Sequence, residues 1–393
     1  MLKFPTRLPD CPGKGDRVGM RRKEATMTAT RVMKTAFLSA CALCFGIAVP
    51  AASSADAIRI GAILSLTGGA AANGLSMRDG IILAADEINR RGGVNGSMID
   101  VAFEDSKGDP HAAVEAFKKM EAGRPPLFYL SFLSTVGVAL GPLTDEKGVV
   151  LVGLSTSAPA FTRGRALVYQ YWPLVQADIP PLLGILRDLK VKSLGILCSN
   201  EEFGMAEQEL AARAFSEAGG TATVKPFETT EVDFHQQIAA LMSQDAIFVA
   251  TFGANVMNAI RQLKQAGYRG RILTPNGGGA PAFAAAPEMQ GVYVVAPIIY
   301  NQRYLFAREA GEKYSTRFQK PFDQWSASGY DFIKLVSGLL EDRPLSRKSV
   351  QDAFGGGFEY SGVFGPVHLK PGDHIVGFPI YPAQVVDKML KYR

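Results

Sequence analysis

Short apolar runs rich in β-branched residues alternate, in the first part of this sequence, with longer segments whose apolar residues recur at helical spacing. One such segment places Ile81, Ala84, Ala85 and Ile88 on a single helical face. Strand and helix in regular alternation predict an α/β fold, with a parallel sheet covered by helices on both faces. The predicted strands are residues 58–64, 98–103, 127–131 and 149–154, and the predicted helices are 74–91, 111–123 and 135–148.

The same alternation starts again after residue 190 and predicts a second sheet. The 336 residues from Ile58 onward are more than one hydrophobic core usually serves, so we expect two doubly wound parallel-sheet lobes. The predicted strands here are 192–198, 221–226, 245–251, 271–274 and 294–297, with helices 203–219, 233–243 and 255–267. Helices 304–320, 324–341 and 346–354 follow, and then closing strands 358–364, 367–369 and 375–386.

The closing strands can return to both lobes, which predicts a hinge of several chain passages. We place these passages near residues 172–176, 296–300 and 363–366. The first lobe then comprises residues 58–174 with 298–363, and the second comprises 175–297 with 364–393. A multi-strand hinge of this kind allows the lobes to close on a ligand.

Residues 1–57 are predicted to be a leader outside the fold. Lys34 precedes an apolar run over residues 35–50, and Ala55-Asp56-Ala57 ends the small residues that follow. This is the pattern of a cleaved signal peptide, and the run is too short to span a membrane. Lipoprotein anchoring at Cys41 is disfavoured, because the apolar run continues past that residue. The first 26 residues are interpreted as upstream sequence, and we expect the mature protein to begin near Ile58.

Charge and cysteine content argue against a nucleic-acid-binding protein and against a disulfide-linked fold. The chain has 42 basic and 37 acidic residues, and residues 1–57 contain nine and four of these. The predicted mature part is therefore formally neutral, with 33 of each, which disfavours nucleic acid as a partner. Cys198 is the one cysteine outside the leader, so no intramolecular disulfide is expected.

The sequence lacks the motifs of enzymes that use this fold class. The Gly-rich segment 68–74 has the wrong spacing for a dinucleotide, and neither a P-loop nor a G-x-S-x-G motif occurs. The four histidines have no second ligand at metal-binding spacing. We therefore expect no catalysis, no cofactor and no metal site.

Three hydroxyl-rich turns follow predicted strands of the first lobe, at residues 65–69, 131–135 and 154–159. Ligands of open parallel sheets bind at the carboxyl ends of strands, beside helix amino termini. Together the turns predict a seat for a carboxylate that uses hydroxyl and amide groups. Ordinary helix capping explains any one of these turns equally well.

The stretch IRIGAILSLTGGAAANGLSMRDGIILAADEINRRGGVNG resembles the opening of the leucine/isoleucine/valine-binding proteins of ATP-driven importers. Glu104-Asp105, Asp109-Pro110 and residues 151–159 extend the resemblance, which covers residues 58–393. It implies the two-lobed fold of type I periplasmic binding proteins, a periplasmic location, a monomer and a membrane permease as partner. A sensory receptor for an amide or small acid is the alternative, and an enzyme on the same fold is a third.

The resemblance also implies binding residues. In the first lobe, the carboxylate-binding serine matches Ser134, with Ser155 and Ser157 as further contacts. The second lobe departs from the pattern: Asn276 stands where amino-acid binders carry an acid, and the aromatic positions hold Phe203 and Phe252 without a tyrosine hydroxyl. Tyr330 matches a further aromatic contact of the family, and Asn73 stands where the family has an aromatic residue near the first turn. Thr67, Phe132, Leu133 and Thr156, in the same turns, complete the candidate set.

The missing acid suggests that the ligand keeps a carboxylate but needs no ammonium group. An unpaired ammonium is costly to bury, and a neutral amide offsets that less well than a carboxylate does. An aromatic or other apolar acid is the favoured ligand, and a branched-chain amino acid is the alternative. The alternative interpretation is that the aromatic candidates are ordinary core residues.

Overall fold

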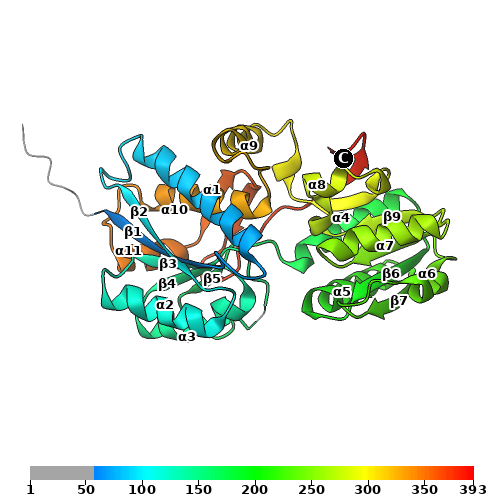
Figure 1. Cartoon of the computed structure of the whole chain (residues 1–393), viewed down its shortest axis with the longest axis horizontal. Helices are drawn as coiled ribbons and strands as arrows, with labels where there is room; N and C mark the ends of the chain where they lie inside the picture. The colour runs from blue at the N-terminus through cyan, green and yellow to red at the C-terminus, as the bar shows by residue number, and fades with distance from the viewer. Residues whose placement is uncertain (1–56, 159) are drawn as a thin grey trace, which may run out of the picture. The chain divides into compact units, whose positions relative to one another are not determined.

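The computed structural model describes residues 57–158 and 160–393 (Figure 1). Apart from Ala57, the predicted leader lies outside these residues. Within the described part of the chain, no helix combines the length and apolarity needed to span a membrane.

The first sheet confirms the predicted parallel arrangement. It consists of β1 (Ile58–Leu64), β2 (Ile99–Asp105), β3 (Phe128–Ser131), β4 (Val150–Gly153) and β5 (Val168–Gln170), in the order β2-β1-β3-β4-β5. All neighbouring strands are parallel, and Ile60 of β1 is in register with Val101 of β2 and Phe128 of β3. The short strand β5 was not predicted. The connecting helices are α1 (Ala71–Asn89), α2 (Pro110–Ala122) and α3 (Ser134–Glu146).

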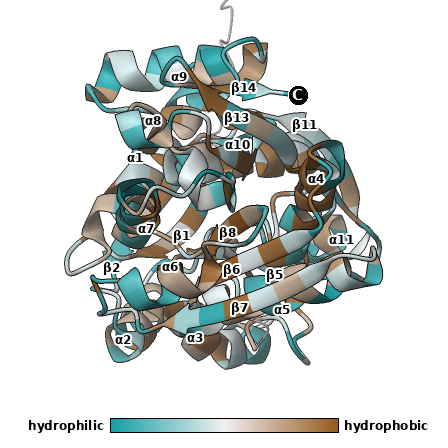
Figure 2. Cartoon of the chain, turned by 90° about the vertical axis from the view of Figure 1, so that its right-hand side faces the viewer, coloured by the Kyte–Doolittle hydropathy of each residue, from teal (hydrophilic) through white to brown (hydrophobic). Residues whose placement is uncertain are grey.

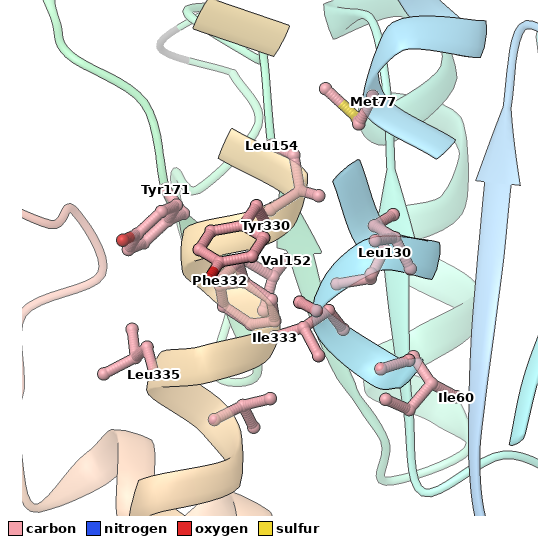
Figure 3. Packing of buried hydrophobic residues seen from close by; sticks show 14 of the residues in the cluster. Ile60, Met77, Leu130, Val152, Leu154, Tyr171, Tyr330, Phe332, Ile333 and Leu335 are labelled. Carbon is pink, nitrogen blue, oxygen red and sulfur yellow. The ribbon is translucent and has the colours of Figure 1, made fainter. Parts of the chain in front are cut away.

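Helices cover both faces of this sheet. Successive residues of a strand face opposite sides, so Ala62 and Leu64 pack in one core and Ile63 in another. The core with Leu64 includes α1 and α10 (Gln324–Leu340), and Figure 3 shows Phe332 and Ile333 of α10 among its side chains. The core with Ile63 includes residues of α2 and α3. Only the ends of the strands therefore remain open for binding.

The second sheet repeats the design and adds two antiparallel strands. Its parallel strands are β6 (Ser193–Ser199), β7 (Thr221–Phe227), β8 (Ala246–Ala250), β9 (Arg271–Thr274) and β10 (Tyr293–Ala296). β13 (Tyr381–Val386) pairs antiparallel with β10 and with β14 (Met389–Tyr392). The order is β14-β13-β10-β9-β8-β6-β7. Its helices are α4 (Val175–Asp188), α5 (Glu202–Glu217), α6 (His235–Leu241) and α7 (Ala254–Gln265).

The second lobe also has a hydrophobic interior of its own. In Figure 2, β6 and β8 are mostly coloured as hydrophobic, in agreement with the full burial of β8. The two predicted doubly wound units are thus confirmed, although α4 and β14 were not predicted.

Shorter elements complete the chain. After β9 come the 3₁₀ turn η1 (Asn276–Gly279), α8 (Pro281–Ala284) and η2 (Pro287–Met289). After β10 come η3 (Ile298–Tyr300), α9 (Leu305–Phe318), α10, α11 (Arg347–Gly355) and the hairpin of β11 (Phe358–Gly362) and β12 (Gly365–Leu369).

The chain crosses from the first lobe to the second for the last time at a later point in the sequence than the predicted residues 363–366. Phe364, Val367, Val376 and Phe378 all pack in the core of the first sheet, whereas β13 belongs to the second sheet. Residues 364–378, expected with the second lobe, therefore pack with the first. The reason is strand pairing, because β12 folds back on β11 and Ile375 forms a bridge with Gln170 of β5.

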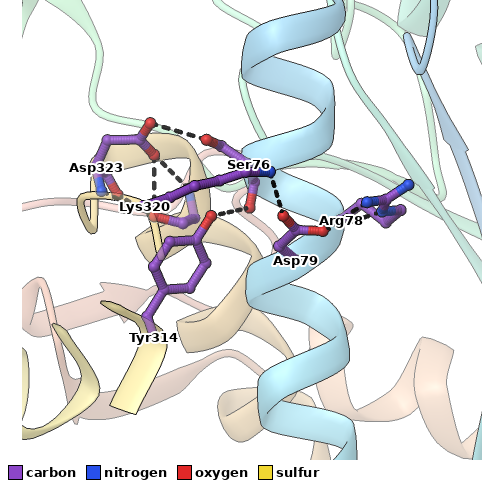
Figure 4. Close-up of polar contacts among 7 residues, drawn as sticks. Ser76, Arg78, Asp79, Tyr314, Lys320 and Asp323 are labelled. Carbon is purple, nitrogen blue, oxygen red and sulfur yellow. Dashed lines mark hydrogen bonds and ion pairs between the residues drawn. The ribbon is translucent and has the colours of Figure 1, made fainter. Parts of the chain in front are cut away.

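Polar contacts hold the beginning of α1 against the beginning of α10 (Figure 4). Ser76 Oγ donates to Asp323, the N-cap of α10, at 3.0 Å. Lys320 Nζ contacts the buried Asp79 carboxylate at 2.8 Å. Ser76 and Asp79 lie in the first half of α1. These contacts therefore fix the amino-terminal end of α1, which follows the turn after β1.

Candidate functional site

The turns after β3 and β4 meet at the carboxyl edge of the first sheet. Leu154 N donates to Ser131 O at 3.0 Å, immediately beyond the two strands. The backbone N–H groups of Ser157 and Ala158 both donate to Ser134 Oγ, at 3.3 Å each. Tertiary structure thus brings together Ser134 and Ser157, two residues that the sequence proposed as partners around one ligand group.

The Ser134 hydroxyl is prepared to act as a donor. Its oxygen already accepts two N–H groups, so its own O–H remains available. Ser134 is also the first residue of α3, and Gly137 N, bonded to Leu133 O, is the first N–H of the helix to find an intrahelical acceptor. The first turn of α3 has no acidic side chain. An anion placed here would meet several free donors and the positive end of the helix.

Leu133 turns the chain into this position through an unusual backbone conformation. It is the N-cap of α3, with φ +74° and ψ 141°, a region that L residues other than glycine rarely adopt. Such conformations cost about 1–3 kcal/mol and persist where the surroundings enforce them. A Cβ built on Gly108 would lie 3.5 Å from both Leu133 Cδ1 and Ser65 Oγ. Gly108 therefore lies close to both the turn after β1 and the turn after β3.

Thr67 and Asn73 lie at the same edge but differ in their surroundings. Thr67 Oγ1 donates to Asp105 at 2.6 Å, and Asp105 also accepts the backbone N–H groups of Leu66 and Thr67. The Thr67 hydroxyl thus ties the end of β1 to the end of β2. Asn73 is half-buried in the first turn of α1.

The other first-lobe candidates divide by burial. Phe132 is a core residue with 1% exposure, and so contributes packing behind the turn. Ser155 is half-buried and Ser157 is exposed. Thr156 is fully buried, and its Oγ1 has no hydrogen-bond partner among the described residues.

The second lobe presents two aromatic rings at its corresponding edge. Phe203 follows β6 and Phe252 follows β8, and their rings pack edge to face with centroids 5.9 Å apart. Phe252 is 53% exposed, which is unusual for so large an apolar side chain. Glu201 caps α5 there, accepting Phe203 N at 2.8 Å and Gly204 N at 2.7 Å. This helix end therefore already carries its own carboxylate.

Asn276 lies directly beyond β9 and is held by an acid that the sequence analysis missed. Its backbone N and its Nδ2 both donate to the Asp178 carboxylate, at 3.1 and 3.2 Å. Glu207 of α5 is fully buried beside Asp178. Burial raises the pKa of Asp178 to about 7, although the Asn276 donors favour its charged form. Burial and the charge of Asp178 raise the pKa of Glu207 well above its usual range.

A sequence signal for one of these acids existed. Glu207 shares a helical stripe with Gly204 and Ala211, both buried, so a charged residue occupied an apolar face. Asp178 gave no comparable signal, because Pro180 and Pro181 disfavour a helix in sequence analysis and the helix that carries Asp178 was therefore not predicted.

Tyr330 is directed away from the carboxyl edge of the first sheet. Its hydroxyl donates to Glu87 at 2.9 Å, and its ring packs in the core shown in Figure 3. Glu87 is near the end of α1, next to Asn89, whose side chain holds the first residue of β2. The Tyr330 hydroxyl therefore reaches toward the amino edge of the sheet, away from Ser134.

Within residues 57–158 and 160–393, no group of three or more His, Cys, Asp or Glu side chains is placed to hold a metal ion.

Comparison with known proteins gives one consistent family. Residues 57–389 match the periplasmic binding protein family. A leucine-, isoleucine-, valine-, threonine- and alanine-binding protein of Pseudomonas aeruginosa is 26% identical over 257 residues, which cover 63% of this chain and 69% of that protein.

Solved structures share the fold. A branched-chain amino acid transporter substrate-binding protein of Streptococcus pneumoniae in complex with isoleucine has a TM-score of 0.71 and 19% identity, over 85% of this chain and 98% of that one. A solute-binding protein of an ABC transporter from Rhodopseudomonas palustris in complex with 3,4-dihydroxybenzoic acid has a TM-score of 0.72 and 18% identity, over 86% and 95%.

The family match spans most of the chain, and the relatives are solute-binding proteins rather than enzymes. Family membership implies a periplasmic or extracellular location and an ABC transporter as partner. The chain belongs to the periplasmic binding protein family, as a solute-binding protein of the branched-chain amino acid type that serves an ABC transporter.

Proposed function

We propose that this protein captures a small carboxylate-bearing molecule between its two lobes and delivers it to a membrane permease. The observation that carries the proposal is the Ser134 hydroxyl, which accepts two N–H groups and sits at the uncapped amino terminus of α3. Hydroxyl and amide donors of this kind stabilise a carboxylate without a charged partner.

An aromatic or other apolar acid fits the second lobe better than an amino acid does. Phe203 and Phe252 offer an aromatic surface, and Phe252 is largely exposed. Asn276 is a neutral amide and supplies no charge for an ammonium group, and its amide nitrogen already donates to Asp178. Relatives and structural neighbours with both kinds of ligand are known, one named for aliphatic amino acids and one solved with 3,4-dihydroxybenzoic acid.

Contact with both lobes would couple binding to hinge closure. A ligand shifts a conformational equilibrium only by its difference in affinity for the two states, and a molecule bridging both lobes favours the closed state. Small-angle scattering should therefore show a smaller radius of gyration when a cognate ligand is added.

Calorimetry tests the ligand assignment and the role of Ser134 together. We expect the mature protein to bind benzoate or 4-hydroxybenzoate more tightly than leucine or valine. Ser134→Ala should weaken binding of that acid by about 1–3 kcal/mol, because the ligand oxygen loses its partner. Ser216→Ala, an exposed serine on α5, is the matched control and should change nothing.

Two results would contradict the proposal. Tight binding of leucine or valine with no binding of aromatic acids would overturn the ligand class. Unchanged affinity in Ser134→Ala would overturn the carboxylate seat. Mass spectrometry of molecules that copurify with the protein provides an independent check on both.

A further inference from the structure

The second lobe buries two acidic side chains side by side, within side-chain hydrogen-bond reach of each other. Asp178 lies in the first turn of α4 and Glu207 in α5, and neither has any exposed surface. Asp178 is well satisfied, because the backbone N and Nδ2 of Asn276 both donate to it. Neither oxygen of Glu207 has a hydrogen-bond partner among the described residues if both acids are ionised.

A proton between the two carboxyl groups resolves this conflict. Two adjacent buried carboxylates repel each other and both lack solvation, so one of them keeps its proton. Asp178 receives the donors that stabilise a negative charge, whereas Glu207 receives none. Glu207 is therefore the neutral acid, and its O–H donates to Asp178. One proton then satisfies Glu207 and removes the repulsion.

This arrangement also decides how Asn276 is oriented. An ionised Asp178 only accepts hydrogen bonds, so the amide nitrogen of Asn276 must face it. The side-chain oxygen of Asn276 then turns away from the acid pair. The chemistry of the partner fixes an amide orientation that atom positions alone leave ambiguous.

We propose that Asp178 and Glu207 hold one proton between them and act as positioning residues for Asn276, keeping its side-chain oxygen available as an acceptor at the carboxyl edge of the second sheet. On the function proposed above, that oxygen receives a hydrogen bond from a donor on the ligand, at the end away from its carboxylate. The second lobe then favours acids that carry a hydroxyl group over acids that carry no hydrogen-bond donor.

Infrared difference spectroscopy tests the shared proton without any ligand. At pH 8 Asp331, whose pKa burial raises to about 6, is ionised and does not interfere. We expect the wild-type protein to show the carbonyl band of a protonated carboxylic acid, and Glu207→Gln to lose it. Glu209→Gln, at an exposed position of the same helix, is the control and should keep it. A spectrum in which wild type and Glu207→Gln do not differ would overturn the shared proton.

Amide exchange tests the positioning of Asn276. We expect its side-chain N–H protons, followed by NMR with labelled asparagine, to exchange slowly in the wild type and in Glu207→Gln. In Asp178→Asn they should exchange at least tenfold faster, while Asn255, which bonds to Thr229 O, remains unchanged. Fast exchange of Asn276 in the wild type would refute the positioning role, even if Asp178→Asn failed to fold.

The ligand experiment separates this inference from the proposed function. In the wild type, 4-hydroxybenzoate should bind about tenfold more tightly than benzoate, and Asp178→Asn should abolish the preference. Loss of binding in Ser134→Ala with an unchanged preference in Asp178→Asn would leave the proposed function intact and overturn only the inference. Unchanged binding in Ser134→Ala, together with a lost preference in Asp178→Asn, would support the inference about the acid pair and overturn the proposed carboxylate seat.

Discussion

The two lobes share one architecture but offer opposite chemistry at the edges where their parallel strands end. The first lobe presents donors: the Ser134 hydroxyl, whose oxygen accepts the N–H groups of Ser157 and Ala158, and the start of α3, where no acidic side chain lies. The second lobe presents acids of its own, with Glu201 on α5 and Asp178 behind Asn276. Under the proposed function, this difference would assign the two ends of one ligand to different lobes.

The lobes also differ in how they satisfy a buried acid. In the first lobe, Asp331 accepts Tyr171 at 2.9 Å, Tyr360 at 3.2 Å and the backbone N of Val363 at 2.8 Å. In the second lobe, Glu207 accepts nothing from the described residues. A carboxylate with three donors can remain charged in the interior, whereas one with none keeps its proton.

The largest expected effect is on stability in the first lobe. Asp331→Ala removes the acceptor of two tyrosine hydroxyls and one backbone N–H, all buried or nearly so. Because buried donors are left without partners, we expect a loss of about 3–5 kcal/mol in the free energy of unfolding. Urea denaturation measures this loss, with the exposed Asp373→Ala as control. If Glu207→Gln destabilised the protein as strongly, the contrast between the lobes would fail.

The pH dependence of stability sharpens the same contrast. Burial raises the pKa of Asp331 to about 6, despite the donors that favour its ionised form. An acid whose folded pKa is raised contributes stability that is complete below its unfolded pKa, near 4, and is lost as pH rises to 6. Relative to Asp331→Asn, the wild type should therefore lose about 2 kcal/mol between pH 4 and pH 6. Thermal denaturation of both proteins across this range measures the difference, and parallel curves would contradict the assignment.

A smaller effect is expected from placing an acid at the donor edge. Thr135 is exposed in the first turn of α3, so Thr135→Glu would bring a carboxylate to the helix end proposed for the ligand. Repulsion and loss of the helix-end field should weaken binding of an anionic ligand by about 1–2 kcal/mol. Thr135→Gln keeps the size without the charge and should bind normally in calorimetry. Equal affinities in the two variants would show that the anion lies elsewhere.

Some of the candidate site followed from local sequence alone. The hydroxyl-rich turns could be located because a parallel sheet collects the carboxyl ends of its strands at one edge, whichever strands are neighbours. Tyr330 could not be placed in this way. Its position depends on the crossing of α1 and α10, which are separated by more than 230 residues, and the structure directs its hydroxyl to Glu87.

Sequence by itself determined the class of fold, the repeated doubly wound units and the turns that follow β1, β3 and β4, because these depend on local periodicity and short-range turn chemistry. Only the tertiary structure decided that residues 364–378 pack with the first lobe, that α4 forms in spite of Pro180 and Pro181, and that Asp178 and Glu207 meet behind Asn276. Each of these depends on contacts between segments far apart in the chain, where burial and pairing outweigh local preference.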